Sequence, residues 1–246
     1  MGAMFSGLPE WNVAQMKNAA QPNRRRTEYS FLTSENVPKR VDLRRTTCFP
    51  YLPPEDQGHE GSCVSHAMSA AVQCAQRRRN IDALESWAPR VEQHFRMARK
   101  TSNAARRRPT EEGITFTEAA KAFANDGIKT FRLKPSLNNF KQCLHSGYPF
   151  VFGFTVTKPM RRWQDSASQQ KASDYVLPDY NPDHAVDGFH SVMAVGYDDC
   201  FRGGSFIVRN SWGPSWGHNG HFFIPYRTMA DERVVKDAIV VDLEDS

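Results

Sequence analysis

The sequence contains no apolar run of the roughly 18 residues that a membrane-spanning helix requires, which argues against membrane insertion. Its first seven residues also lack the basic and then apolar pattern of a classical signal peptide. The five cysteines are odd in number and form no Cys-x-x-Cys pair, so neither a disulfide framework nor a zinc ribbon is indicated. We therefore expect a reducing compartment: the cytoplasm, or a host cytosol reached without a classical signal peptide.

Aromatic residues do not accompany the positive charge, although the net charge is +5. Basic regions that bind single-stranded nucleic acid usually carry interleaved aromatic side chains for stacking. Their absence makes nucleic acid an unlikely partner, and a solvated surface is the simplest interpretation of the arginine clusters. An acidic partner stays open as an alternative. The clusters lie at 24–26, 77–79, 106–108 and 161–162.

The chain is long enough to build a substantial core, with 246 residues, 39% hydrophobic residues and 11% aromatic residues. This length favours a single unit of two lobes over two full domains. Residues 1–38 are polar and proline-punctuated, and we expect an N-terminal arm that packs on the body. The body is expected to span 39–246, with a helical lobe at about 60–147 and a strand-rich lobe at about 148–246.

Hydrophobic periodicity predicts that helices dominate the first half of the chain and strands the second. This segregation favours an α+β fold over a doubly wound parallel sheet. The polar stretch 158–187 is predicted to be a long loop. The predicted helices are 64–78, 81–99, 117–125 and 137–146, and the predicted strands are 149–156, 189–197, 204–210, 220–225 and 238–243.

Cys63 lies at the predicted start of the first helix. Unpaired backbone N–H groups and the helix dipole favour a thiolate at such a position. The pKa of a free thiol is about 8.5, and a helix N-terminus or a cationic neighbour lowers it to roughly 3.5–7.5. Cys63 is therefore a candidate nucleophile if a histidine lies beside it, while a small core residue is the alternative.

A histidine and an asparagine follow in the strand-rich half. His190 enters an apolar strand, and Asn210 ends the next strand, close to Trp212 and Trp216. A single cysteine with a downstream histidine and asparagine is the outline of a thiol hydrolase, with thiolate nucleophile, imidazole base and orienting amide.

Three motifs make the chain similar to the papain-like cysteine peptidases. The family's Gln and Gly-Ser-Cys motif is present at 57–63, and its His followed by Val-Gly-Tyr is present at 190–197. Its Asn-Ser-Trp-Gly-x-x-Trp-Gly-x-x-Gly motif is complete at 210–220. The resemblance covers the chain from about Val37 to Tyr226 and implies a two-lobed fold with the active site between the lobes.

The resemblance implies a role for each matching residue. Trp212 would shield the Asn–His hydrogen bond and, with Gly113, would line the substrate-binding cleft. No metal and no organic cofactor is expected. The nucleophile, its histidine partner, the orienting amide and the oxyanion-hole donor would be Cys63, His190, Asn210 and Gln57.

Two other histidines, His184 and His66, are alternative candidates for a functional role. His184 also resembles a family motif, but Val-Gly-Tyr lies eleven residues beyond it and only five beyond His190, which favours His190. His66 lies one turn from Cys63, but no third metal ligand has suitable spacing, so a histidine on the helix face is expected.

The chain departs from the secreted members of the family. Glu60 and Val64 stand where those proteins have a cysteine and an aromatic residue, so the usual disulfide cannot form. This places the chain closer to the bacterial and viral branch. The arm at 1–38 replaces the long propeptide, and the resemblance implies a possible short inhibitory prosegment, as in a zymogen.

The sequence thus predicts an endopeptidase that acts on protein or peptide substrates. A deamidase or acyltransferase with the same thioester intermediate is one alternative, and a catalytically silent binding module is another.

Overall fold

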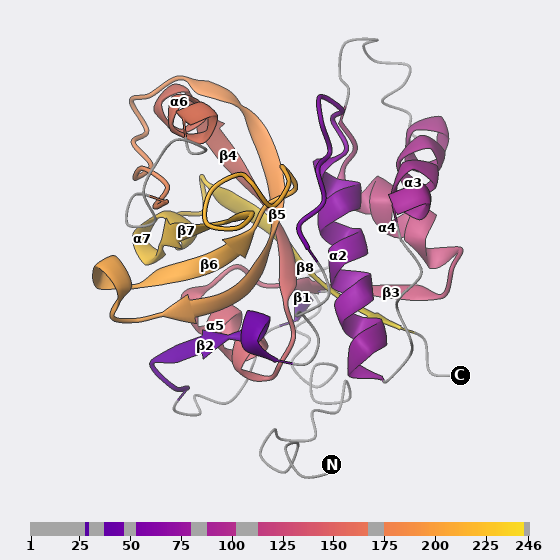
Figure 1. Ribbon diagram of the computed structural model, residues 1–246, viewed down its shortest axis with the longest axis horizontal. Helices are drawn as coiled ribbons and strands as arrows, with labels where there is room; N and C mark the ends of the chain where they lie inside the picture. The colour runs from indigo at the N-terminus through magenta and orange to yellow at the C-terminus, as the bar shows by residue number, and fades with distance from the viewer. Residues whose placement is uncertain are drawn as a thin grey trace.

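The computed structural model describes residues 28–29, 37–46, 53–79, 88–101, 113–166 and 175–243. Figure 1 shows three helices gathered on one side of the molecule and a curled sheet on the other. These helices are α2 (Cys63–Arg78), α3 (Ala88–Thr101) and α4 (Phe116–Ala124). Helix α2 packs directly on the sheet, and α3 and α4 pack against each other.

The sheet has eight strands, and seven of them follow the order β1-β3-β8-β4-β5-β6-β7, while β2 pairs with β5. All pairings are antiparallel except the parallel pair β1–β3. The expected α+β fold is therefore confirmed. The strands are β1 (Glu28–Tyr29), β2 (Arg40–Asp42), β3 (Ile128–Leu133), β4 (Phe150–Thr157), β5 (Val186–Asp198), β6 (Ser205–Arg209), β7 (His221–Pro225) and β8 (Val235–Leu243).

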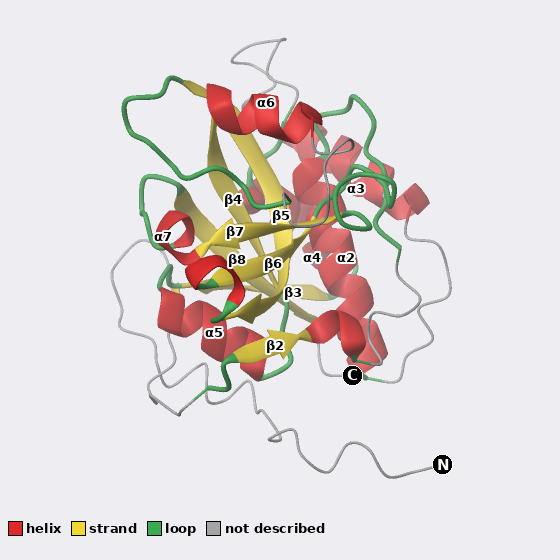
Figure 2. Cartoon of the chain, turned by 60° about the vertical axis from the view of Figure 1, so that its left-hand side comes forward, coloured by secondary structure: helices red, strands yellow, loops and turns green. Residues whose placement is uncertain are grey.

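The remaining helices connect the strands. Helix α5 (Leu137–His145) precedes β4, and α6 (Lys158–Ser166) follows it directly. In Figure 2, α6 crosses the end of β4 and β5, and α5 lies at the opposite end of the sheet. The helix α7 (Tyr226–Met229) and the short 3₁₀ helices η1 (Leu43–Arg45) and η5 (Phe201–Gly203) complete the described elements.

The first helix matches its prediction within one residue because its apolar positions repeat at helical spacing. Helix α4 begins with a capping box between Thr115 and Glu118, in which each side chain bonds the other residue's backbone N–H. Strand β4 is buried along nearly its whole length, as its apolar run indicates. Phenylalanines from α5, β4, β6 and β7 form the centre of the core: Phe140, Phe150, Phe152, Phe154, Phe206 and Phe222.

Two predictions from the sequence are wrong. The predicted loop at 158–187 contains α6, whose Met160 and Gln164 are buried one turn apart among polar neighbours. Strand β3 was not predicted, because only its first and last residues are buried and its middle is partly exposed. This strand belongs to the stretch assigned to the helical lobe, yet it pairs with β8 of the strand-rich lobe.

Of the N-terminal arm, the structure describes only β1 and the residues from Val37 onward. Glu28 and Tyr29 pair with Arg132 and Leu133, which places this piece of the arm at the outer edge of the sheet beside β3.

Candidate active site

Cys63 is the first residue of α2, and Ser62 is the N-cap. Its thiol is free and partly buried. Burial raises the pKa of the thiol, while hydrogen bonds from the Ser191 backbone and side chain and from the backbone N–H groups of Val64 and Cys63 oppose that rise. The start of the helix therefore supplies donors to the sulfur, as the sequence position indicates.

His190 lies in β5 and is 5% exposed. Its Nε2 is 2.8 Å from Oδ1 of Asn210. An amide oxygen only accepts hydrogen bonds, so Nε2 carries the proton and Nδ1 of the neutral ring keeps its lone pair. Burial lowers the pKa of His190 to about 4, the Asn210 hydrogen bond opposes this, and the Arg161 charge lowers it further.

Asn210 directly follows β6 and is 3% exposed. Its Oδ1 also accepts a hydrogen bond from the backbone N–H of Ser211 at 2.9 Å. The backbone N–H of Asn210 donates to the Gly220 carbonyl at 3.0 Å. Because two N–H groups converge on one side-chain atom, that atom must be the amide oxygen. The turn that follows Asn210 thus orients its side chain independently of the contact with the imidazole.

Trp212 stacks on His190 with ring centroids 4.8 Å apart and planes 24° from parallel. Trp216 meets Trp212 edge-on at 5.0 Å. The turn that carries both tryptophans depends on glycine: Gly217 and Gly220 have φ values of +59° and +75°. A Cβ atom would lie 2.6 Å from the His221 carbonyl oxygen at Gly217 and 2.4 Å from Pro54 at Gly220, so larger residues do not fit.

Gln57 belongs to the loop before α2 and lies against this same turn. Its backbone N–H donates to the Ser211 carbonyl at 2.8 Å, and its Oε1 accepts from the Ser211 hydroxyl. Nε2 donates one hydrogen to the Glu60 carbonyl at 2.7 Å. An amide nitrogen carries two hydrogens, so the second is available as a donor.

Gly113 lies beside the loop that precedes Cys63. A Cβ atom on Gly113 would be 3.8 Å from the Gly61 carbonyl oxygen. Gly61 is two residues before Cys63. The backbone of Gly113, at the start of the stretch that leads into α4, therefore lies next to the segment that carries the candidate nucleophile.

The electrostatics of the site oppose part of the sequence-based expectation of an ionised Cys63–His190 pair. Burial disfavours the thiolate and the imidazolium individually, as the two pKa shifts show.

The other histidines occupy different environments. His184 is exposed in a turn, where its N–H donates to the Asn181 carbonyl, so the geometry favours His190 as the partner of Asn210. His221 is buried at the first position of β7, the strand at the edge of the sheet beside β6. His66 lies on the face of α2, as expected, and its Nδ1 is 3.0 Å from Oε2 of Glu55.

Two further residues of the site, Ser191 and Arg161, were not predicted from the sequence. Ser191 directly follows His190 in β5 and hydrogen-bonds to Cys63. Arg161 of α6 pairs with Asp187 at 3.1 Å and affects the charge state of His190. The adjacency of Ser191 to His190 was a usable signal, whereas Arg161 lay in the segment predicted to be a loop.

The sequence is similar to cysteine peptidases of the papain family. The model of the papain family cysteine proteases matches residues 136–240. An uncharacterised peptidase C1-like protein of Acanthamoeba polyphaga mimivirus is 31% identical over 130 residues, which is 53% of this chain and 39% of that protein. Pro-cathepsin H of Mus musculus is 33% identical over 76 residues, 31% of this chain and 20% of that protein. The chain thus spans well under half the length of these relatives.

Solved structures resemble the whole fold. Xylellain, a cysteine protease from Xylella fastidiosa, superimposes with a TM-score of 0.70 at 21% identity and covers 89% of this chain and 92% of its own. Digestive procathepsin L2 proteinase from Tenebrio molitor gives a TM-score of 0.64 at 19% identity, covering 87% of this chain and 70% of its own. The resemblance to papain-like cysteine peptidases is confirmed, and the fold is their two-lobed α+β fold.

None of the helices in the described part of the chain is both long enough and apolar enough to cross a membrane.

Proposed function

We propose that this papain-like chain is a cysteine-type endopeptidase that hydrolyses peptide bonds through a thioester formed on Cys63. The observation that supports this most strongly is the His190–Asn210 hydrogen bond of 2.8 Å. It fixes the imidazole tautomer in which Nδ1 accepts a proton, as the base of a thiol hydrolase requires.

In the acylation step the Cys63 sulfur attacks the peptide carbonyl carbon, and His190 takes the thiol proton. The second Nε2 hydrogen of Gln57 and the Cys63 backbone N–H stabilise the negative oxygen of the tetrahedral intermediate. When the C–N bond breaks, His190 gives its proton to the departing amine. Asn210 and Trp212 keep the ring aligned and dry during this exchange.

In the deacylation step water attacks the thioester carbonyl, and His190 accepts a proton from the water. The C–S bond breaks, the carboxylic acid leaves and the thiol is restored. Gly113 is proposed to offer its backbone to the bound peptide, because it lies beside Gly61 at the entrance to the nucleophile helix.

A peptide-library cleavage assay on the wild type beside Cys63→Ala tests this function. We expect new peptide termini with the wild type and none with the variant. Mass spectrometry of glutamine-containing peptides separates the alternatives, since deamidation adds about one dalton without chain cleavage. Absence of both turnover and labelling of Cys63 by a vinyl-sulfone probe would instead favour a binding module.

The proposed substrates are proteins or peptides. The arginine cluster at 77–79 makes contacts inside the protein, since Arg78 stacks on Tyr148 and Arg79 pairs with Asp242. Arg161 likewise pairs with Asp187, and the clusters at 24–26 and 106–108 lie outside the described residues. An acidic partner therefore stays an alternative without a contact to support it, and we assign no role in nucleic-acid binding.

We propose a reducing compartment, cytoplasmic or within a host cytosol. Cys63, Cys74, Cys143 and Cys200 are free, and Cys48 lies outside the described residues. Non-reducing mass analysis of freshly folded protein should count five free thiols. Two bridged pairs would contradict this localisation.

A further inference from the structure

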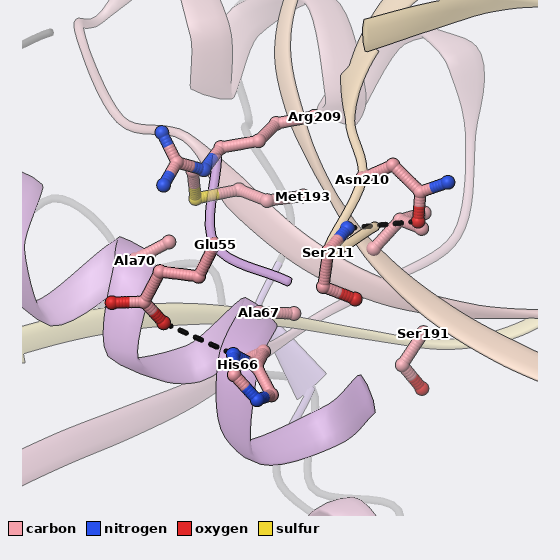
Figure 3. Close-up of a pocket in the computed structure, with 10 residues that line it drawn as sticks. Glu55, His66, Ala67, Ala70, Ser191, Met193, Arg209, Asn210 and Ser211 are labelled. Atoms are coloured by element: carbon pink, nitrogen blue, oxygen red, sulfur yellow. Dashed lines mark hydrogen bonds and ion pairs between the residues drawn. The ribbon is translucent and has the colours of Figure 1, made fainter. Parts of the chain in front are cut away.

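Three ionisable side chains line one pocket together with Asn210 and Ser211, and the catalytic scheme uses none of the three. His66 Nδ1 of α2 is 3.0 Å from Oε2 of Glu55. Arg209 closes β6, is 5% exposed and interacts electrostatically with Glu55. Figure 3 shows the Glu55 carboxylate turned toward His66, with the Arg209 guanidinium lining the same pocket. We call Glu55, His66 and Arg209 the interlobe charge cluster.

The cluster connects the segments that carry the site. His66 is three residues after Cys63 in α2, and Arg209 directly precedes Asn210. Glu55 lies two residues before Gln57 in the loop that precedes α2. The Glu55 carboxylate therefore contacts the helix of the nucleophile directly and lies within electrostatic range of the residue that precedes the orienting amide.

The Glu55 loop is also fastened through its backbone to the turn after β6. The Gly213 N–H donates to the Glu55 carbonyl at 3.0 Å, and Asp56 and Trp212 form a β-bridge. The Gln57 N–H donates to the Ser211 carbonyl at 2.8 Å. These bonds align the loop with the strand-rich lobe. Within the cluster, Glu55 is the residue that also attaches this loop to α2, through His66.

The charges make this attachment sensitive to substitution. Burial lowers the pKa of Arg209, and the nearby Cys74 and Glu55 oppose that shift. Removal of Glu55 takes away one of the two groups that offset the burial of Arg209, and the loss of a buried interaction costs more than the loss of an exposed ion pair. Small displacements of an oxyanion donor reduce catalysis strongly, because the donor must lie about 3 Å from the developing charge.

We propose that Glu55, bonded to His66 and within electrostatic range of Arg209, is a positioning residue that holds the Gln57 loop in register with Cys63. This inference rests on the proposed peptidase function. It predicts that the cluster acts on transition-state stabilisation through Gln57, and that peptide binding and the reactivity of the thiol are nearly independent of it.

The principal experiment compares Glu55→Gln with the wild type, Gln57→Ala and the double variant in peptide hydrolysis. Glu55→Gln should lower kcat about tenfold with KM within about threefold. Gln57→Ala should lower kcat roughly 10²–10³-fold, as expected for one oxyanion donor. In the Gln57→Ala background, Glu55→Gln should cost under about threefold, because both changes remove the same function.

A rescue pair covers the case in which Glu55→Gln does not fold. The amide of Asn at position 66 can donate to Glu55 as Nδ1 does, whereas Phe cannot. His66→Asn should keep kcat within about threefold of the wild type, and His66→Phe should lose about tenfold.

Asp126→Asn is the matched control. His94 Nε2 and Asp126 Oδ2 form a histidine–carboxylate pair of 2.8 Å between α3 and the turn after α4. Asp126→Asn should lower the Tm and leave kcat of the folded protein unchanged.

Full additivity of Glu55→Gln and Gln57→Ala, or a loss of kcat equal to that of Asp126→Asn, would overturn the proposal. A parallel fall in the rate of Cys63 alkylation would also overturn it, because the cluster would then act on the thiol. If the wild type itself cleaves no peptide, the proposed function fails instead.

Discussion

The two lobes supply the candidate site in different ways. The helical lobe contributes Cys63 at the partly buried start of α2, where the donors around the sulfur include backbone N–H groups. The strand-rich lobe contributes His190 and Asn210 from buried positions whose side chains are already hydrogen-bonded to each other. One lobe therefore supplies a reactive atom, and the other supplies a pre-oriented pair.

This difference separates activity from stability. The Cys63 sulfur interacts with the strands only as a weak acceptor for Ser191 of β5, so its loss should cost little folding free energy. Asn210 bonds His190 and Ser211 through one oxygen, and its loss leaves buried donors without an acceptor. Four predictions test the comparison, in order of decreasing effect.

The largest effect is expected from the paired variants Cys63→Ala and His190→Ala. Each should reduce kcat by several orders of magnitude, and the double variant should lose little more, because the two side chains act as one unit. Peptide hydrolysis with His184→Ala as the control measures this. An equal loss of kcat in His184→Ala would show that His190 is not the base.

The second effect distinguishes the lobes directly. Asn210→Ala should lower kcat roughly 10–100-fold and also lower the free energy of unfolding by about 1–3 kcal/mol, as expected for buried donors left unpaired. Cys63→Ala should leave the free energy of unfolding within about 1 kcal/mol of the wild type. Urea unfolding of both variants checks this, and equal destabilisation would refute the contrast between the lobes.

The third effect concerns acid. Burial lowers the pKa of His190 to about 4 and that of His221 to about 3. The unfolded chain, with histidine pKa near 6.5, binds more protons between these values, so stability falls as pH falls from about 6.5 toward 4.

His221→Phe should therefore reduce the acid-induced loss of unfolding free energy by roughly 1–3 kcal/mol. Urea unfolding between pH 7 and about 4.5 measures this. An unchanged slope against pH would show that His221 is not buried as a neutral group.

The smallest effect is expected from deleting residues 1–36. The β1–β3 pair places Glu28 and Tyr29 at the edge of the sheet, which favours the interpretation of the arm as an added strand. The Tm should fall by a few degrees while vinyl-sulfone labelling of Cys63 stays within about twofold. Labelling at least tenfold faster would support an inhibitory arm instead.

The sequence predicted the site residues where each carries a local signal. The Cys63 helix start, the strand around His190 and the tryptophan-rich turn after Asn210 are all visible in short stretches of sequence. Helix α6 was missed because most of its residues are polar, and its burial depends on contacts with β4 and β5. The Glu55–His66 contact was missed because the path of the loop before α2 determines it.

Strand β8 has a consequence for the order in which a newly made chain can assemble. Strands β4, β5, β6 and β7 are neighbours in both sequence and sheet, so each can pair as soon as it leaves the ribosome. Strand β3 is made before all of these, yet its partner β8 is the last strand of the described chain and also supports α2. The strands β4 to β7 can therefore pair during translation, whereas β3 and the β8 side of the α2 contact wait for the last described strand.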